Sequence, residues 1–223
     1  MKQLVIAAHP DDEILGCGGT INKLSQKGVE SYVLILTGGA ETRYAKEMEL
    51  VLKNNAIKAN DLINTKEVFF ENLPNQQLDT IPLLKMIETI EKYIGKIKPE
   101  SVLTQHCGDL NKDHQLVYEA TITAVRPLAG QVVKRLYSYF VPSSTEWNFV
   151  SEKNVFIPNV FVDISEEIET KINAMKCYES ECRPYPHPRS PEAIKNYALY
   201  FGLTVGMHYV EPLRLIRDIS GII

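Results

Sequence analysis

The sequence predicts an α/β fold of the Rossmann-like type, a three-layer sandwich with helices on both faces of a mostly parallel central sheet. Short apolar and β-branched segments alternate along the chain with longer segments of helical character, as expected of successive strand–helix–strand units. The chain has 223 residues, of which 44% are hydrophobic and 23% charged, which suits one compact domain with a large core. We therefore expect a single domain over residues 1–223.

Local patterns identify the individual elements. Apolar and β-branched runs predict strands over residues 3–8, 30–36, 66–70, 101–105, 134–141 and 157–163. Helical periodicity, with glycine or proline as an end signal, predicts helices over residues 14–27, 42–56, 81–97, 113–125 and 191–201. A further helix is expected after Ser165, which would cap it, with Glu166 and Glu167 in the first turn. In such sheets ligands bind beyond the carboxyl ends of the strands, so functional side chains are expected there.

Charge and hydropathy exclude several classes of protein. The formal net charge of −4 is unlike that of nucleic-acid-binding proteins, which carry a basic patch or stripe, and it does not favour binding to anionic membranes. The apolar run over residues 4–8 is too short for a membrane span or a signal-peptide core. We therefore expect no nucleic-acid partner, no integral membrane segment and a cytoplasmic location, with the four cysteines as reduced thiols.

The first expected strand ends in a cluster of metal-binding side chains. His9, Pro10, Asp11, Asp12 and Glu13 follow it directly. Proline fixes its own φ and keeps the preceding residue extended, which would place His9 and the carboxylates on the rim of the sheet. His9 and Asp12 can converge on one ion across this turn, while Asp11 points elsewhere. Acids at a helix N-terminus can also serve only as caps, but three acids beside a histidine favour a bound cation, which relieves their repulsion.

A second polar segment, HCGDLNKDH, follows the fourth expected strand at residues 106–114. Asp113 is suited to cap the next helix, and His114 lies in its first turn. There His114 could act as a third ligand beside His9 and Asp12; the alternative is a histidine that is satisfied on the helix face. Two imidazoles and one carboxylate leave a fourth position open, as in catalytic rather than structural zinc sites. Water bound at such a position has its pKa lowered to about 7 and becomes a nucleophile.

Together the two segments resemble those of a known family. AHPDDEILGCGGTI (residues 8–21) followed by GDLNKDH (residues 108–114) is similar to the LmbE/PIG-L deacetylase family. TGGAETR (residues 37–43) stands where that family has a glycine-rich turn after its second strand. PHPRS (residues 186–190) and GLTVGMHYVEPL (residues 202–213) resemble the C-terminal part of the sugar-deacetylase members. The resemblance thus extends over nearly the whole chain.

The resemblance implies the roles of individual residues. It implies that His9, Asp12 and His114 bind zinc, that Asp11 is the general base, and that Asp113 orients a ligand histidine. The implied activity is a zinc-dependent N-deacetylase that converts the acetamide of an N-acetylated sugar of the N-acetylglucosamine type to acetate and a free amine. The sugar could be free, or nucleotide-, lipid- or thiol-linked. Related deacetylases form trimers or hexamers, so a homo-oligomer is one expectation.

One position departs from the family pattern. Many members have a histidine three residues before the last ligand, where this chain has Asn111. The Asn111 amide could still donate to a developing oxyanion, an interaction worth about 3–4 kcal/mol, but it cannot act as a titrating acid. His187 is a candidate to supply the missing function, with packing of its proline-rich loop as the alternative. Arg43 could hold a phosphate or a sugar hydroxyl, or could be a solvated side chain.

Three other functions stay open at this stage. The first is a zinc amidase of the same scaffold that acts on a non-sugar amide. The second is a non-catalytic zinc-binding module, which the presence of Asp11 disfavours. The third is a phosphohydrolase that holds magnesium with clustered aspartates, which the histidine ligands disfavour because imidazole suits zinc better than magnesium.

Overall fold

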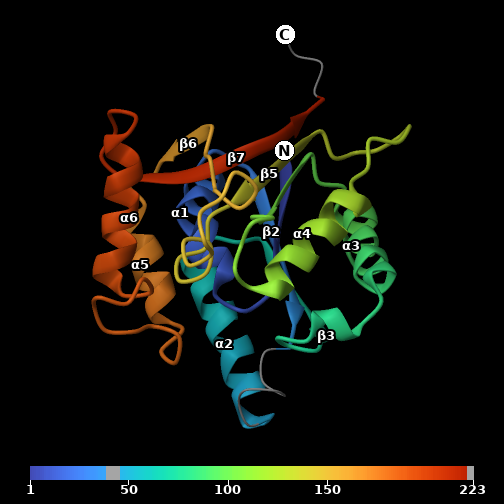
Figure 1. Ribbon diagram of the computed structural model, residues 1–223, viewed down its shortest axis with the longest axis horizontal. Coiled ribbons are helices and arrows are strands. Elements are labelled where there is room, and N and C mark those ends of the chain that lie inside the picture. Colours follow the sequence, from blue (N-terminus) through green and yellow to red (C-terminus); the bar gives the residue numbers. More distant parts are fainter. Residues whose placement is uncertain (39–45, 220–223) are drawn as a thin grey trace.

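The computed structural model describes residues 1–38 and 46–219, and it contains a seven-stranded sheet between two layers of helices (Figure 1). One face of the sheet is covered by α1 (Asp12–Gln26), α2 (Lys46–Leu62), α5 (Ile168–Lys176) and α6 (Pro191–Leu203). The other face is covered by α3 (Leu83–Ile97) and α4 (Lys112–Ala124), and a short 3-10 helix, Leu78–Thr80, precedes α3. The expected three-layer α/β sandwich is therefore confirmed.

The order of the strands places the functional segments side by side. The sheet runs β3-β2-β1-β4-β5-β7-β6, with β3, β2, β1, β4 and β5 parallel and β7 antiparallel to both of its neighbours. The strands are β1 (Lys2–Ala7), β2 (Glu30–Thr37), β3 (Glu67–Leu73), β4 (Ser101–Gln105), β5 (Arg135–Tyr139), β6 (Val160–Asp163) and β7 (Val210–Asp218). The chain reverses its direction of winding between β1 and β4, and the carboxyl ends of strands at such a switch point form a ligand-binding crevice.

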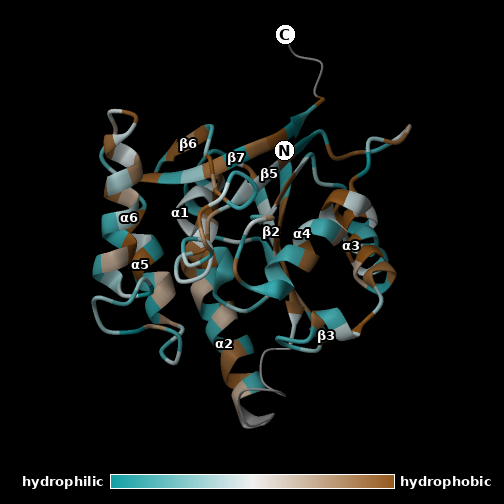
Figure 2. Cartoon of the chain, viewed as in Figure 1, coloured by the Kyte–Doolittle hydropathy of each residue, from teal (hydrophilic) through white to brown (hydrophobic). Residues whose placement is uncertain are grey.

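The central strands are apolar because both of their faces are covered. Along β1, Leu4 and Ile6 pack against the α3 and α4 side, while Val5 and Ala7 pack against the α1 and α2 side, and all four are fully buried. Such near-continuous apolar runs are typical of parallel strands covered on both faces. The helices instead carry both hydrophobic and hydrophilic residues (Figure 2), and their apolar residues pack against the sheet.

Three differences from the predicted elements concern a helix start, a missed strand and a helix end. The helix expected after Ser165 begins at Ile168, because the Asp163 side chain accepts hydrogen bonds from the Ser165 backbone N–H at 3.0 Å and hydroxyl at 2.6 Å and holds a local turn there. The long strand β7 was not predicted, although it joins β5 and β6 in the sheet. The start of the helix expected over residues 42–56 lies outside the described residues, and that helix continues to Leu62.

Replacing Gly16 with alanine is expected to destabilise the fold. A Cβ atom at Gly16 would lie 2.2 Å from Cδ2 of Tyr139, a fully buried ring whose hydroxyl donates to the Ile6 carbonyl at 2.8 Å. Overpacking of this kind costs about 1–3 kcal/mol of unfolding free energy, measurable by chemical denaturation. Gly95→Ala is the matched control, since a Cβ there meets no atom within 4 Å and helical alanine is favoured by up to about 1 kcal/mol. Equal unfolding midpoints for the two variants would contradict this prediction.

Candidate active site

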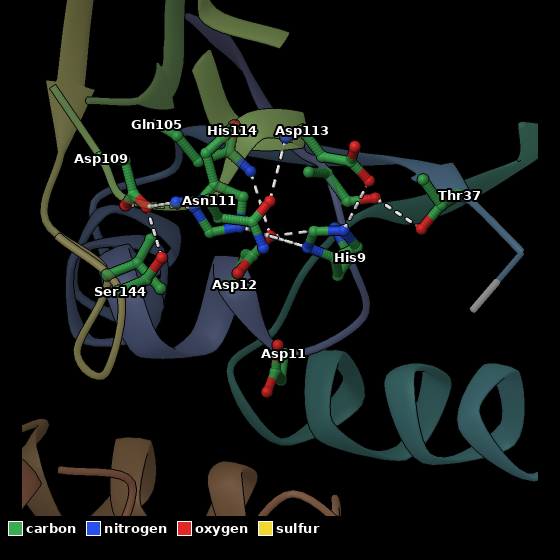
Figure 3. A network of polar contacts seen from close by, with 12 residues as sticks. His9, Asp11, Asp12, Thr37, Gln105, Asp109, Asn111, Asp113, His114 and Ser144 are labelled. Carbon is green, nitrogen blue, oxygen red and sulfur yellow. Dashed lines mark hydrogen bonds and ion pairs between the residues drawn. The ribbon is translucent and has the colours of Figure 1, made fainter. Parts of the chain in front are cut away.

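Three predicted ligands meet at the carboxyl ends of β1 and β4. His9 Nδ1 lies 3.2 Å from His114 Nε2 and 3.4 Å from Asp12 Oδ2, and His114 Nε2 lies 3.3 Å from Asp12 Oδ2 (Figure 3). A tetrahedral zinc ion with bonds of about 2.0–2.1 Å requires ligand atoms about 3.3 Å apart. The three atoms therefore form a nearly equilateral triangle of the size that a divalent ion such as zinc requires.

Two further carboxylates orient the histidine rings. Asp113 Oδ2 lies 3.1 Å from Nε2 of His9, and Asp109 Oδ2 lies 3.1 Å from Nδ1 of His114. A neutral ring that carries its proton on the nitrogen facing Asp113 or Asp109 has a lone pair on its other nitrogen, which lies at the triangle and can bind a metal ion. Asp113 is itself held by the backbone N–H groups of Gln76 at 2.7 Å and Leu78 at 3.1 Å. The rings are thus arranged as metal sites require.

Electrostatics at the triangle favour a positive charge. Burial acts to lower the pKa of His114, but the carboxylates of Asp12 and Asp109 raise it to about 10. Burial likewise acts to raise the pKa of Asp12, yet the charges and hydrogen bonds of His114 and His9 hold it well below its ordinary value. Asp12 also accepts hydrogen bonds from the His9 backbone N–H at 2.9 Å and from Gln105 Nε2 at 3.1 Å. Protons or a bound cation can supply the charge that these buried carboxylates need.

Asp11 lies next to the triangle but points away from it (Figure 3). Its φ of 108° is unusual for a residue other than glycine, and such strained backbone is common at functional sites. Its Oδ2 accepts a hydrogen bond from Arg189 Nη1 at 2.9 Å. Burial raises the pKa of the Asp11 carboxyl to about 8, while the charge of Arg189 acts in the opposite direction. The carboxyl is therefore suited to exchange a proton near neutral pH.

A polar cavity of about 430 Å³ adjoins these residues, a volume typical of small-molecule sites. Most of its wall consists of polar and charged side chains, with Leu110 and Trp147 as apolar exceptions. The lining residues are Gln76, Leu110, Asn111, Lys112, Ser143, Ser144, Trp147, Glu181, Arg183, His187 and Arg189. Their composition suits a hydroxyl-rich ligand that also presents an apolar face to an aromatic ring.

The structure places Asn111 and His187 in this cavity wall. Asn111 Oδ1 caps α4 by accepting from the Asp113 backbone N–H at 2.9 Å, so its amide nitrogen is left to donate, and it lies 3.5 Å from Gln76 Oε1. His187 Nδ1 accepts from the Arg189 backbone N–H at 3.1 Å, which leaves Nε2 to carry the proton of the neutral ring. Burial and the nearby arginines lower the pKa of His187. Both side chains can therefore donate a hydrogen bond.

The structure does not place one predicted site residue, and it adds two that were not predicted. Arg43 lies outside the described residues, so the structure does not place it. Asp109 and Arg189 were not predicted as site residues. Asp109 lies within the HCGDLNKDH segment and Arg189 within PHPRS, so motif membership was a signal for both. Asp11, the partner of Arg189, is 178 positions away in the sequence, while His114, the partner of Asp109, lies in the same segment; the sequence pattern shows neither contact.

The fold and site together define an α/β enzyme domain with a His–Asp–His group that can hold a metal ion at a strand switch point. Residues 4–125 match the PIG-L family model, described as GlcNAc-PI de-N-acetylase, and the chain belongs to that family. The family that the sequence motifs indicated is therefore confirmed. The family model is that of a de-N-acetylase, which is a hydrolase of amide bonds, so the expected enzyme class is confirmed as well.

Individual relatives cover almost the whole chain. Diacetylchitobiose deacetylase of Thermococcus kodakarensis is 29% identical over 231 residues, which cover 98% of this chain and 84% of that protein. The solved structure of N,N'-diacetylchitobiose deacetylase from Pyrococcus horikoshii has a TM-score of 0.78 at 23% identity and covers 97% of this chain and 84% of its own. GalB, the 4-carboxy-2-hydroxymuconate hydratase of Pseudomonas putida KT2440, has a TM-score of 0.75 at 20% identity, with both chains fully covered. A hydratase with this architecture shows that the fold alone does not select the reaction.

Among the helices of the described residues, none combines the length and the apolar composition needed to span a membrane.

Proposed function

We propose that the chain is a zinc-dependent N-deacetylase that hydrolyses the acetamide of an N-acetylated sugar of the N-acetylglucosamine type. The observation that carries this proposal is the triangle formed by His9 Nδ1, Asp12 Oδ2 and His114 Nε2, with sides of 3.2–3.4 Å. Three ligands of this kind leave an open coordination position, which is the arrangement of catalytic zinc. The polar cavity beside them and the diacetylchitobiose deacetylases among the relatives support a sugar substrate.

The residues around the triangle supply the proton transfers. When bound, zinc lowers the pKa of a water ligand to about 7 and polarises the amide carbonyl. Asp11 accepts a proton as the oxygen of water bonds to the carbonyl carbon, and it returns that proton to the nitrogen as the C–N bond breaks. The products are acetate and a free amine. The amide of Asn111 donates to the oxyanion that develops, and His187 donates to the substrate from the cavity wall.

Acetate release from a panel of acetamides tests the proposal. The purified protein, loaded with zinc, is incubated with N-acetylglucosamine, diacetylchitobiose, a nucleotide-linked N-acetylglucosamine and N-acetylputrescine as a non-sugar acetamide. We expect release from one or more sugars and little from N-acetylputrescine. Preference for the non-sugar compound would favour the alternative amidase. Absence of release from every compound, with zinc bound, would favour the non-catalytic alternative.

Metal analysis of the purified protein tests which ion is bound. Imidazole ligands favour zinc over magnesium, so we expect zinc to be retained through purification. Magnesium in its place, together with phosphate-ester hydrolysis, would favour the phosphohydrolase alternative.

Four sequence-based predictions are carried forward as proposals. These are the single-domain organisation, the cytoplasmic location, a trimeric or hexameric assembly and the contact of Arg43 with the substrate. The position of Arg43 five residues beyond Gly38, after β2, is the sequence feature that motivates the last of them.

Asp113→Asn is expected to weaken metal binding about 10- to 100-fold, the usual effect of losing a carboxylate that orients a ligand histidine. The Asp113 carboxylate fixes the proton on His9 Nε2, and an amide can present a donor there instead. Competition with a chromogenic chelator measures the affinity. Asp79→Asn, an exposed carboxylate in the neighbouring 3-10 helix, is the matched control and should leave affinity unchanged. Equal affinities in the two variants would show that Asp113 does not orient the ligand.

A further inference from the structure

Arg189 binds three acceptors that come from separate parts of the chain. Its Nη1 donates to Asp11 Oδ2 at 2.9 Å and to Glu181 Oε2 at 2.8 Å, and its Nε donates to Ser143 Oγ at 2.7 Å. The Arg189 side chain is 23% exposed and lines the cavity. Because a guanidinium is planar and rigid, contacts on two of its nitrogens fix its orientation. Arg189 therefore presents a fixed cation to Asp11.

Asp11 has particular need of such a partner. Its side chain is only 3% exposed and lies in a run of three consecutive acids, Asp11, Asp12 and Glu13. Within residues 1–38 and 46–219, Arg189 is the cation that forms an ion pair with Asp11. Buried carboxylates without a partner are costly, and one next to a cation can turn toward it. Asp11 directly precedes the predicted ligand Asp12, so a metal ion held by His9, Asp12 and His114 would be an alternative positive charge for an Asp11 carboxylate that lost Arg189.

Glu181 limits how strongly Arg189 can neutralise Asp11, and Ser143 helps to fix the guanidinium. The same Nη1 atom is shared between the carboxylates of Asp11 and Glu181, so neither receives the whole charge. Ser143, with a φ of 67°, is held in place by its backbone N–H, which donates to Glu146 Oε1 at 2.7 Å. The guanidinium is thus anchored by Ser143 and Glu181 as well as by Asp11.

We infer that Arg189 is a positioning residue that holds the Asp11 carboxylate outside the metal-ligand set, where it stays available for proton transfer. This inference rests on the proposed deacetylase function. Arg189 does not contact the reacting atoms in this proposal; it acts through Asp11. The open coordination position is thereby kept for water and substrate instead of being filled by a fourth carboxylate.

A double-mutant cycle with Asp11 tests the inference on the zinc-loaded protein. Arg189→Ala is expected to lower kcat about 10- to 100-fold, a part of the usual contribution of general acid–base catalysis, with KM changed less than about threefold. Zinc content should be unchanged. In an Asp11→Asn background the same substitution should cause no further loss, because its effect passes through Asp11. Guanidinium ion added at millimolar concentration should restore part of the activity of Arg189→Ala.

Controls separate positioning from a structural role. Arg189→Lys should fold normally and regain only part of kcat, since an ammonium cannot reproduce the two-nitrogen geometry; the cycle is repeated with it if Arg189→Ala does not fold. Arg126→Ala removes an exposed arginine that pairs with Glu91 at 3.8 Å and should leave kcat unchanged. Additive losses in the Asp11→Asn background would overturn the inference and indicate direct substrate binding. An Asp11→Asn variant with full activity would instead contradict the proton-transfer role proposed for Asp11, and a wild-type protein that releases no acetate would contradict the proposed function.

Discussion

Asp11→Asn is expected to lower kcat about 100- to 10,000-fold, the range associated with loss of a general base, while zinc stays bound. Asparagine has nearly the same shape as aspartate, and its carbonyl can still accept the hydrogen bond from Arg189 Nη1 that Asp11 Oδ2 accepts at 2.9 Å. The variant should therefore fold and keep its ligand triangle. It cannot accept a proton from water or return one to the amine. Steady-state acetate release and metal analysis of the same preparation measure both quantities.

A matched substitution makes this result specific. Asp61→Asn removes an exposed carboxylate on α2 and changes the net charge by the same amount, so it should leave kcat unaltered. If Asp11→Asn kept more than about one tenth of the wild-type kcat, the loss would be too small for a general base. The proton would then have to be accepted elsewhere, and the mechanism proposed for Asp11 would be wrong.

The ligand triangle could be predicted because its members depend on local rules. His9 and Asp12 lie three residues apart directly after a strand, and His114 lies in the first turn of the helix after another strand. Although His9 and His114 are 105 positions apart in the sequence, the carboxyl ends of parallel strands meet at one edge of the sheet. The observed pairing of β1 with β4 brings them together.

The surroundings of the triangle could not be predicted in the same way. Asp109 and Asp113 lie in one short acidic segment, and only the folded chain shows that Asp109 faces His114 while Asp113 faces His9. The contact of Arg189 with Asp11 joins residues 178 positions apart through loops. Loop conformations depend on tertiary contacts more than on sequence pattern, so the motif PHPRS indicated importance without indicating which partner Arg189 would have.

Long-range and side-chain contacts also account for the secondary-structure predictions that differ from the structure. A serine followed by two glutamates is a common helix start, but the carboxylate of Asp163 binds both the N–H and the hydroxyl of Ser165 and delays the helix. Strand β7 contains a proline at position 212 and charged residues at its end. These residues interrupt the apolar and β-branched pattern from which strands are predicted. Its place between β5 and β6 is set by long-range pairing.

His114→Ala is expected to abolish metal binding and to lower kcat/KM by more than about 1,000-fold. The variant removes one of three ligands, deprives Asp109 of its charge partner and leaves Asp12 with His9 alone. A catalytic metal contributes several kcal/mol to transition-state stabilisation, and each 1.4 kcal/mol or so is a factor of ten in rate. Treatment of the wild-type protein with a chelator should cause a comparable loss, which added zinc reverses in the wild type but not in His114→Ala.

Thermal unfolding supplies a second readout that does not depend on turnover. A ligand present at about 1,000 times its dissociation constant stabilises the folded state by about 4 kcal/mol, so zinc should raise the unfolding midpoint of the wild type and not of His114→Ala. His208→Ala, which removes an exposed histidine that stacks on Tyr209, should respond to zinc as the wild type does. Full activity in chelated protein that contains no metal would overturn the metal assignment, because the two imidazoles and the carboxylate would then have to act by themselves.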